Sequence, residues 1–386
     1  MSNLNIYLPP FAPDYSGCSS ALYELGGMIV LHDASGCTGN VLGYDEPRWQ
    51  KADSSRALVY CSAYRHMEAV LGLDDQVNER IIQAAESLKP KFIALVGSPV
   101  PMLVGTDYNG IAKQLEAKTG IPSFGFDTKG LEFYDNGYMK ATNALIERYA
   151  RKEKTVKRSI NLLGLNPIDF GNRGNDKAII SLIKKNGIKI NCSFSMNFTL
   201  EDIKKAGASE LNVVLSEGGY EVALFMKKKF GIPFITSLPF SDGKMFLEEI
   251  NAALENREVK RKDVKKDTNR RVLIIGEQVS SNTLRKELED RGLTSDVAIL
   301  FSHRPELLNE NDYSFVQEKD INRIINSGRY TDIIADPIIK QLLKRNDVHF
   351  HEMASVAVSS KFHWDEVRPL LGDEMEAFLS EIANIQ

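Results

Sequence analysis

The feature that most constrains the fold is a repeated alternation of short apolar, β-branched runs with longer segments of helical periodicity. The runs are apolar throughout, as is typical of parallel strands that are covered by helices on both faces. Three successive parts of the chain each hold four such runs. The runs fall at residues 27–31, 57–60, 92–96 and 121–124, then at 160–163, 188–191, 212–215 and 232–235, and finally at 271–275, 296–300, 332–335 and 348–350.

Two basic stretches separate these parts. Residues 147–158 and 255–271 carry most of their charge as Lys and Arg, in a chain whose formal net charge is −4. We interpret them as solvated helix ends with connectors; a docking patch for an acidic partner is the alternative. The sequence therefore predicts an α/β protein with three Rossmann-like domains, 1–150, 151–265 and 266–386, each with a parallel sheet of about four strands flanked by helices.

The composition excludes several classes of protein. A balance of 48 Lys and Arg against 52 Asp and Glu argues against nucleic acid as a partner. The hydrophobic share of 43% is too high for a disordered chain. The amino terminus shows no export signal and no apolar run is long enough to span a membrane, which predicts a cytoplasmic location without membrane contact. The four cysteines are therefore not expected to form a disulfide framework.

Thiol and polar side chains follow the strands of the first part. His32 and Asp33 come directly after its first run, and Cys37 follows soon after. Cys61 follows the second run and Ser98 the third. Parallel sheets bind ligands beyond the carboxyl ends of their strands, where these residues are expected to meet. This edge is the predicted site.

Several motifs of other enzyme classes are absent. No GxGxxG follows the first run of any part, and no GxxxxGK[ST] occurs, so the chain itself is not expected to bind a dinucleotide or hydrolyse ATP. GxSxG and HExxH are missing too, which removes the usual support for a serine hydrolase or a zinc protease. The cysteine spacing is not that of a zinc site. We interpret His32 and His66 as structural residues in preference to metal ligands.

Residues 26–40 resemble the strand-then-Gly-Cys segment of the nitrogenase component 1 superfamily. Residues 69–75, 97–107 and 230–233 are similar to three further motifs of that superfamily, in the same order. Its members include molybdenum-iron protein subunits, dark-operative protochlorophyllide reductase subunits and related tetrapyrrole reductases. The resemblance spans the chain and implies the same three-domain fold.

The resemblance also implies a cofactor. Cys37, preceded by Gly36, matches a thiolate ligand of an iron-sulfur cluster that is held between two subunits. Cys18 lies in the segment of the family's first ligand, but closer to Cys37 than is usual, whereas Cys61 has no family counterpart and lies at a neighbouring strand end. Either is a candidate second ligand. A third family cysteine falls at Pro99 and is lost.

The departures from the family pattern limit which cofactor the resemblance implies. The second-domain cysteine that ligates the molybdenum cofactor would fall at residues 215–217, where no thiol occurs, and Cys192 lies on another strand. A molybdenum cofactor is therefore not expected. Four thiolates suffice for a 4Fe-4S cluster. Two chains that give two each would supply them, in a homodimer or in a heterodimer with a similar chain.

The resemblance implies that the chain is the catalytic component of a two-component, ATP-dependent reductase that works under anaerobic conditions. It would receive electrons from a separate ATP-hydrolysing iron-sulfur protein and reduce a small molecule between its domains. Asp33 would donate a proton if it is buried, and a turn or helix-cap role is its alternative. The candidate catalytic and substrate-cleft residues are Asp33, His32, Ser98, Ser216, Glu217 and Tyr220.

Two other functions stay open. One is a non-catalytic scaffold or carrier for a metallocluster or tetrapyrrole precursor, and the other is a solute-binding protein with merely buried cysteines. For the reductase, the partner is expected to dock over the Cys37 loop, where Tyr44, Asp45, Glu46 and Trp49 suggest an exposed aromatic with flanking charges. Packing of Trp49 in the core is the alternative.

Overall fold

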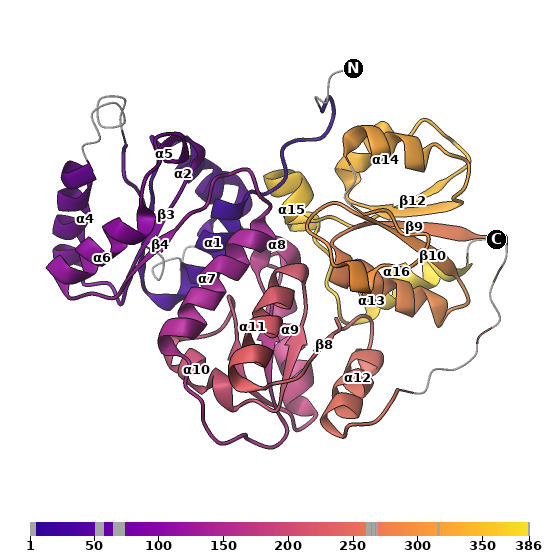
Figure 1. Ribbon diagram of the computed structural model, residues 1–386. Coiled ribbons are helices and arrows are strands. Elements are labelled where there is room, and N and C mark those ends of the chain that lie inside the picture. The colour runs from indigo at the N-terminus through magenta and orange to yellow at the C-terminus, as the bar shows by residue number, and fades with distance from the viewer. Residues whose placement is uncertain are drawn as a thin grey trace.

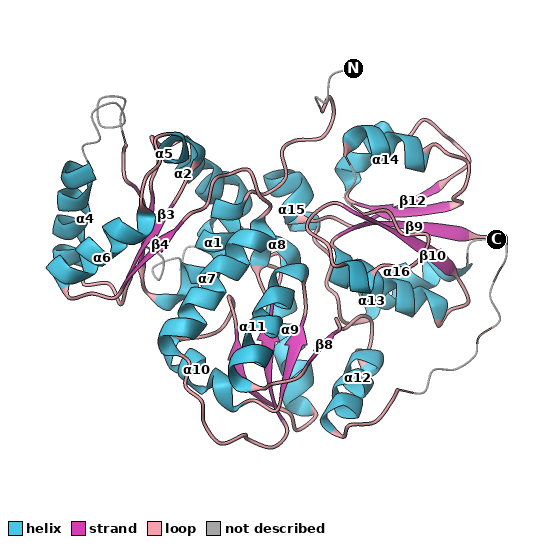
Figure 2. Cartoon of the chain, viewed as in Figure 1, coloured by secondary structure: helices cyan, strands magenta, loops and turns pink. Residues whose placement is uncertain are grey.

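The computed structural model describes residues 5–50, 58–64, 74–259, 264, 267, 269–314 and 317–384. It contains three separate four-stranded sheets that follow one another along the chain, each with helices packed against it (Figure 1). Figure 2 shows the three groups of strands with helices between and around them. The predicted α/β fold class is confirmed. His66 and most of the 69–75 motif lie outside the described residues.

The first sheet is parallel, with strand order β2-β1-β3-β4. Its strands are β1 (Met28–Leu31), β2 (Leu58–Cys61), β3 (Ile93–Val96) and β4 (Ser123–Phe126). The accompanying helices are α1 (Asp14–Leu22), α2 (Gly36–Asn40), α4 (Asp74–Leu88), α5 (Pro99–Leu103), α6 (Tyr108–Thr119) and α7 (Tyr134–Tyr149). Along β1, Met28 and Val30 pack against α4 and α6, while Ile29 and Leu31 pack against α1 and α7. This burial of both faces explains why the run is apolar throughout.

Helices α1 and α7 approach each other closely at two glycines. A Cβ atom on Gly17 would lie 1.8 Å from the carbonyl oxygen of Tyr134, and one on Gly137 would lie 1.7 Å from that of Asp14. No side chain fits at either position, so the two helices pack backbone against backbone. The residues of α1 are buried as a consequence.

The second sheet is also parallel, with strand order β6-β5-β7-β8. Its strands are β5 (Ser159–Leu163), β6 (Lys189–Ser193), β7 (Leu211–Val214) and β8 (Phe234–Thr236). The accompanying helices are α8 (Pro167–Phe170), α9 (Asn175–Lys185), α10 (Leu200–Lys205), α11 (Tyr220–Phe230) and α12 (Lys244–Leu254). Cys192 is buried on β6, away from the first sheet's edge, as the sequence predicts.

The third sheet repeats the arrangement with strand order β10-β9-β11-β12. Its strands are β9 (Arg271–Gly276), β10 (Thr294–Ile299), β11 (Asp332–Ala335) and β12 (His349–Glu352). Its longer helices are α13 (Gln278–Glu289), α14 (Glu318–Ile325) and α16 (Asp373–Asn384), with the short α15 (Val356–Ser359). Every run predicted from the sequence overlaps one of the strands in these three sheets.

A buried arginine links the first two sheets. The Arg48 guanidinium donates to the carbonyl oxygen of Ser20 in α1 and to that of Ser195, beyond β6, both at 2.8 Å. Its Nε donates to the Glu46 carboxylate at 2.8 Å, and Glu24 lies 3.2 Å from Nη1. One side chain therefore forms hydrogen bonds with segments that accompany both sheets.

The amino-terminal segment lies against the part of the chain that carries the third sheet. The backbone N–H groups of Ile6, Tyr7 and Leu8 donate to the Glu318 carboxylate at 2.8–3.0 Å. Glu318 begins α14 and stands 312 positions after Ile6 in the sequence. The segment thus joins the first part of the chain to the last. No described helix has the length and apolarity that a membrane crossing needs.

Candidate functional site

The carboxyl edge of the first sheet brings two cysteines to one aspartate. Cys61 ends β2, and its thiol donates to the backbone carbonyl of Asp33 at 3.2 Å. Cys37 lies in α2, with its thiol beside the Asp33 carboxyl and the hydroxyls of Tyr15 and Ser98. Both cysteines are half-buried. The predicted edge therefore holds two accessible thiols around Asp33.

Asp33 holds the loop that carries Cys37. It is buried, and its carboxylate accepts the backbone N–H of Ser35 at 2.9 Å and that of Thr38 at 3.2 Å. These are the bonds of a turn and helix cap. A Cβ atom on Gly36 would meet nothing within 4 Å, so the space before Cys37 is open.

His32 and Ser98 are buried in the frame of the same edge. The His32 Nδ1 atom lies 3.0 Å from the Ser62 hydroxyl, and its ring packs on Tyr64 with centroids 4.3 Å apart. The Ser98 hydroxyl donates to the His32 carbonyl oxygen at 2.8 Å. Both residues are therefore buried side chains that hold the strand ends of this edge together.

The electrostatics of Cys37 favour the neutral thiol. Burial, and secondly the Asp33 charge, raise the pKa of Cys37. A thiolate at this position needs a nearby positive charge such as a metal ion. Within the described residues, no three His, Cys, Asp or Glu side chains are placed to hold one metal ion.

Cys18 is separated from this pair. It is 0% exposed inside α1, and burial raises its pKa well above the usual range. The charged groups nearest to it are Asp14 and Lys140, not Asp33. Cys37 and Cys61 therefore each contact Asp33, whereas Cys18 lies in the packed interface between α1 and α7.

The prediction that Asp45 and Glu46 are exposed charges on a docking surface is wrong. Asp45 and Glu46 are both buried, and Glu46 is paired with Arg48. Burial raises the pKa of Asp45 to about 6. Tyr44 and Trp49 are exposed, as the sequence predicts for the aromatic residues of this surface.

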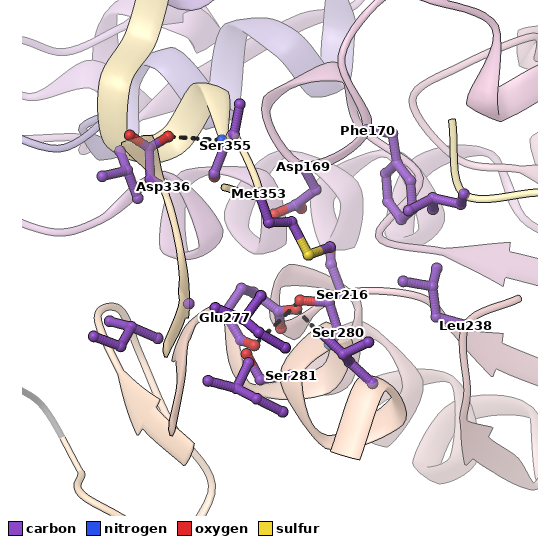
Figure 3. Close-up of a pocket in the computed structure, with 18 of the residues that line it drawn as sticks. Asp169, Phe170, Ser216, Leu238, Glu277, Ser280, Ser281, Asp336, Met353 and Ser355 are labelled. Carbon is purple, nitrogen blue, oxygen red and sulfur yellow. Dashed lines mark hydrogen bonds between the residues drawn. The ribbon is translucent and has the colours of Figure 1, made fainter. Parts of the chain in front are cut away.

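A second candidate site is a largely enclosed cavity of about 80 Å³ between the second and third sheets (Figure 3). Three carboxyls line it. Asp169 belongs to α8, Glu277 follows β9 directly and Asp336 follows β11 directly. Serine hydroxyls and apolar side chains, among them Met353, make up the rest of the wall.

Two of these carboxyls interact. Asp169 accepts a hydrogen bond from the Tyr134 hydroxyl and one from Asn166 at 2.6 Å. Burial, and secondly the charge of Glu277, raise the pKa of Asp169. Glu277 accepts the N–H groups of Val279 and Glu217 at 2.8 and 2.7 Å, yet burial still raises its pKa. Two neighbouring buried carboxyls do not both ionise readily.

The second-part residues predicted to line the substrate cleft do not lie at one site. Ser216 lines the cavity and donates to the Gly164 carbonyl oxygen at 2.8 Å. Glu217 lies beside it, and burial raises its pKa to about 9 against the opposing charge of Arg304. Tyr220 donates to Glu306 at 3.0 Å and does not line the cavity. Ser98 belongs to the first-sheet edge, so the predicted cleft is not one site.

Sequence reasoning missed Asp169, Glu277 and Asp336. A signal for two of them was present, because Glu277 and Asp336 stand immediately after strands, at the edge where parallel sheets bind ligands. Asp169 carries no such signal, since it comes from a short helix beyond β5.

Replacing Asp169 with asparagine is expected to flatten the pH dependence of stability. A carboxyl with a raised pKa keeps a proton in the folded state that the unfolded chain releases above about pH 4. The free energy of unfolding therefore falls as the pH rises through this window and levels off above the raised pKa. Urea unfolding at pH 5 and pH 8 should show a loss that is about 1–3 kcal/mol smaller in Asp169→Asn than in the unsubstituted chain.

The matched control for this measurement is Glu374→Gln, because Glu374 is exposed at the surface. Its pH profile should follow that of the unsubstituted chain. Identical slopes in Asp169→Asn and the unsubstituted chain would contradict the assignment of a buried proton to Asp169.

Comparison with known proteins agrees with this fold. The family model of nitrogenase component 1 type oxidoreductases matches residues 14–275. NifE, a nitrogenase iron-molybdenum cofactor biosynthesis protein of Clostridium pasteurianum, is 27% identical over 174 residues, which cover 44% of this chain and 37% of that protein. One of the subunits of the light-independent protochlorophyllide reductase of Chlorobium chlorochromatii is 27% identical over 151 residues, covering 36% and 28%.

The solved structures extend the likeness over the whole chain. The structure of Nitrogenase Cp1 at pH 5 aligns with a TM-score of 0.69 and 17% identity, and covers 100% of this chain and 90% of that one. At this identity the likeness shows the fold alone. The aligned stretches span well under half the length of the two curated relatives. Because the family model matches more than half of the sequence, the chain belongs to the nitrogenase component 1 type oxidoreductase family.

Proposed function

We propose that this chain is the catalytic-component subunit of a two-component, ATP-dependent reductase. It binds an iron-sulfur cluster at a subunit interface and takes electrons from a separate ATP-hydrolysing iron-sulfur protein, to reduce a small molecule. The observation that carries the proposal is the pair of accessible thiols, Cys37 and Cys61, held around Asp33 at the open edge of the first sheet.

The residues present at this edge fit half of a cluster site. A 4Fe-4S cluster takes four thiolates, and two chains with two thiols each supply that number. Cys61 is the better second ligand, because Cys18 is fully buried in α1, whereas Cys61 is half-buried and contacts Asp33 as Cys37 does. When bound, the cluster supplies one-electron transfer. The chain's own part is to hold the two thiols, and Asp33 does so through its bonds to Ser35 and Thr38.

An apolar surface next to Cys37 supports a dimer. Ser98, which precedes α5, lies beside the Cys37 thiol, and Gly130 approaches Pro99 at the start of the same helix. We call the exposed apolar side chains there the α5 patch. They are Val100, Leu103 at 80% exposed, Val104 and Leu131 at 75% exposed. Apolar side chains gathered on a surface mark an interaction site, and a second chain on the α5 patch would bring its own cysteines near these two.

A second function has one observation in its favour. The relative from Clostridium pasteurianum is described as a cofactor biosynthesis protein. This supports the alternative of a non-catalytic scaffold or carrier for a metallocluster or a tetrapyrrole precursor. Such a chain would bind its cargo without accepting electrons from a partner.

The test is electron uptake by the anaerobically purified protein from the ATP-hydrolysing iron-sulfur protein of the same organism. The chain is expected to be a dimer that contains iron and is reduced only when MgATP is present. Leu103→Asp places a charge in the α5 patch, so it should give monomers by light scattering and lose most of the iron. Leu88→Asp is the matched control, because Leu88 is 38% exposed on the distant α4 and should change neither.

Each failure of this test has its own meaning. A monomer that carries a full 4Fe-4S complement would contradict the shared site. A dimer that binds iron but takes up no electrons with MgATP would favour the scaffold. A chain without iron or acid-labile sulfide would contradict both and favour a solute-binding protein.

A further inference from the structure

The cavity between the second and third sheets has an unusual lining. Its wall is apolar apart from serines and the three carboxyls Asp169, Glu277 and Asp336. Among the described residues that line it there is no Lys, Arg, His or Cys. The wall therefore offers nothing to balance an anionic ligand and no thiolate or imidazole for a metal cluster.

One serine in this wall has a hydroxyl group without a hydrogen bond in the described part of the chain. Ser281 is 3% exposed, and its backbone N–H makes only the helical bond to the Glu277 carbonyl oxygen at 3.0 Å, while its hydroxyl is open to the cavity. Figure 3 shows it in the wall next to Glu277. Buried hydroxyls are nearly always hydrogen-bonded, so an unpaired one at a cavity indicates a missing ligand or water.

The positively charged side chain near the cavity forms ion pairs with residues that do not line it. Arg304, the cation nearest to Glu217, is paired with Glu217 and Glu221. On the other elements packed against the pair, Tyr134 donates to Asp169, and Asp135 adds further negative charge near Tyr134.

At the remaining end of the cavity, burial raises the pKa of Asp336, although its carboxyl accepts the N–H groups of Ile338 and Ser355. None of these groups neutralises Asp169 and Glu277. Two like charges in a largely apolar cavity cost free energy, which a bound cation would relieve.

We propose that this cavity binds a small organic cation, whose ammonium or amidinium group lies between the carboxylates of Asp169 and Glu277 and the hydroxyl of Ser281. The inference deepens the proposed function, on which it rests, by naming the class of its substrate. Ammonium and amidinium groups are donors only, and this corner of the cavity offers acceptors.

The size of the cavity limits the ligand. One water needs about 10–15 Å³ of such space, so about 80 Å³ admits a few waters or a ligand with few non-hydrogen atoms. The raised pKa values of Asp169 and Glu277 add a signature. Because both pKa values are raised, the pair is expected to share a proton in the absence of a ligand, and a bound cation should favour the ionised forms and release that proton.

The test uses methylammonium chloride as the probe, titrated calorimetrically into the dimeric protein at pH 6 and constant ionic strength. Saturable binding is expected for methylammonium and none for sodium acetate. Repeating the titration in buffers of different ionisation enthalpy should reveal proton release. Asp169→Asn and Glu277→Gln should weaken the affinity at least about tenfold. Ser281→Leu, which fills the cavity and leaves both carboxyls in place, should abolish binding, whereas Glu374→Gln should not change it.

The outcomes are distinct. Absence of methylammonium binding, equal binding of acetate, or an affinity unchanged by Ser281→Leu would each overturn the proposal. Should a carboxyl variant fail to fold, Ser281→Leu still decides. Iron content, dimer state and electron uptake of the unsubstituted chain test the proposed function separately, so a protein that passes those and binds no cation disproves this inference alone.

Discussion

Replacing Cys37 with alanine is expected to abolish iron-sulfur cluster binding. In a shared site with two thiolates from each chain, the change removes two of four ligands at once, because both chains carry it. Iron and acid-labile sulfide per chain should fall to background after anaerobic purification. The thiol is half-buried and the alanine is compatible with helix α2, so the variant should fold and stay measurable.

Alanine variants of the other three cysteines provide matched comparisons. Cys192→Ala should leave the iron content unchanged, because Cys192 is buried on β6. Cys61→Ala should lose iron as Cys37→Ala does, whereas Cys18→Ala should keep it. Equal iron content in Cys37→Ala and the unsubstituted chain would contradict the cluster assignment. Loss of iron in Cys18→Ala but not in Cys61→Ala would show that Cys18, not Cys61, is the second ligand.

Replacing Arg48 with methionine is expected to lower the free energy of unfolding by about 3–5 kcal/mol. The substitution leaves the Glu46 carboxylate buried without its partner, and it removes the donors to the carbonyl groups of Ser20 and Ser195. Burial alone would lower the pKa of Arg48, but the charge of Glu46 and the hydrogen bond to it raise the pKa overall, so the site favours the ion pair. Urea unfolding followed by circular dichroism would measure the loss.

Two further variants identify the cause. Arg48→Met combined with Glu46→Gln should recover part of the loss, because the unpaired charge is then gone. Arg323→Met removes an arginine that is paired with Asp320 at the surface, and should have little effect. A loss in Arg48→Met no larger than in Arg323→Met would show that the buried link contributes little.

Local pattern was sufficient to predict the sheets but not the environment of single charged residues. The strands are predictable because burial on both faces requires unbroken apolar runs, as Met28 to Leu31 illustrate. Asp45 and Glu46 look solvated in the sequence. They are buried because Ser16, Arg48 and Ser360 bind them, and Ser360 lies 315 positions from Asp45.

The candidate sites were predictable to the same extent. The strand-end rule correctly places Cys61 and Asp33 at one edge, since the strands that precede them pair in register. It does not show which face of α1 carries Cys18, because the close contact of α1 and α7 depends on glycines that are 120 positions apart. The acidic cavity needs two separate sheets to face each other, which no local pattern encodes.

The hydrogen bonds between residues 6–8 and Glu318 have a consequence for biosynthesis. The amino-terminal segment leaves the ribosome long before α14 has been made, so it has no partner while the parts of the chain with the first two sheets emerge. Docking of the segment must therefore be among the last events of folding, after the third domain has formed. Nascent chains arrested before residue 318 should leave residues 6–8 open to proteases, and completed chains should protect them.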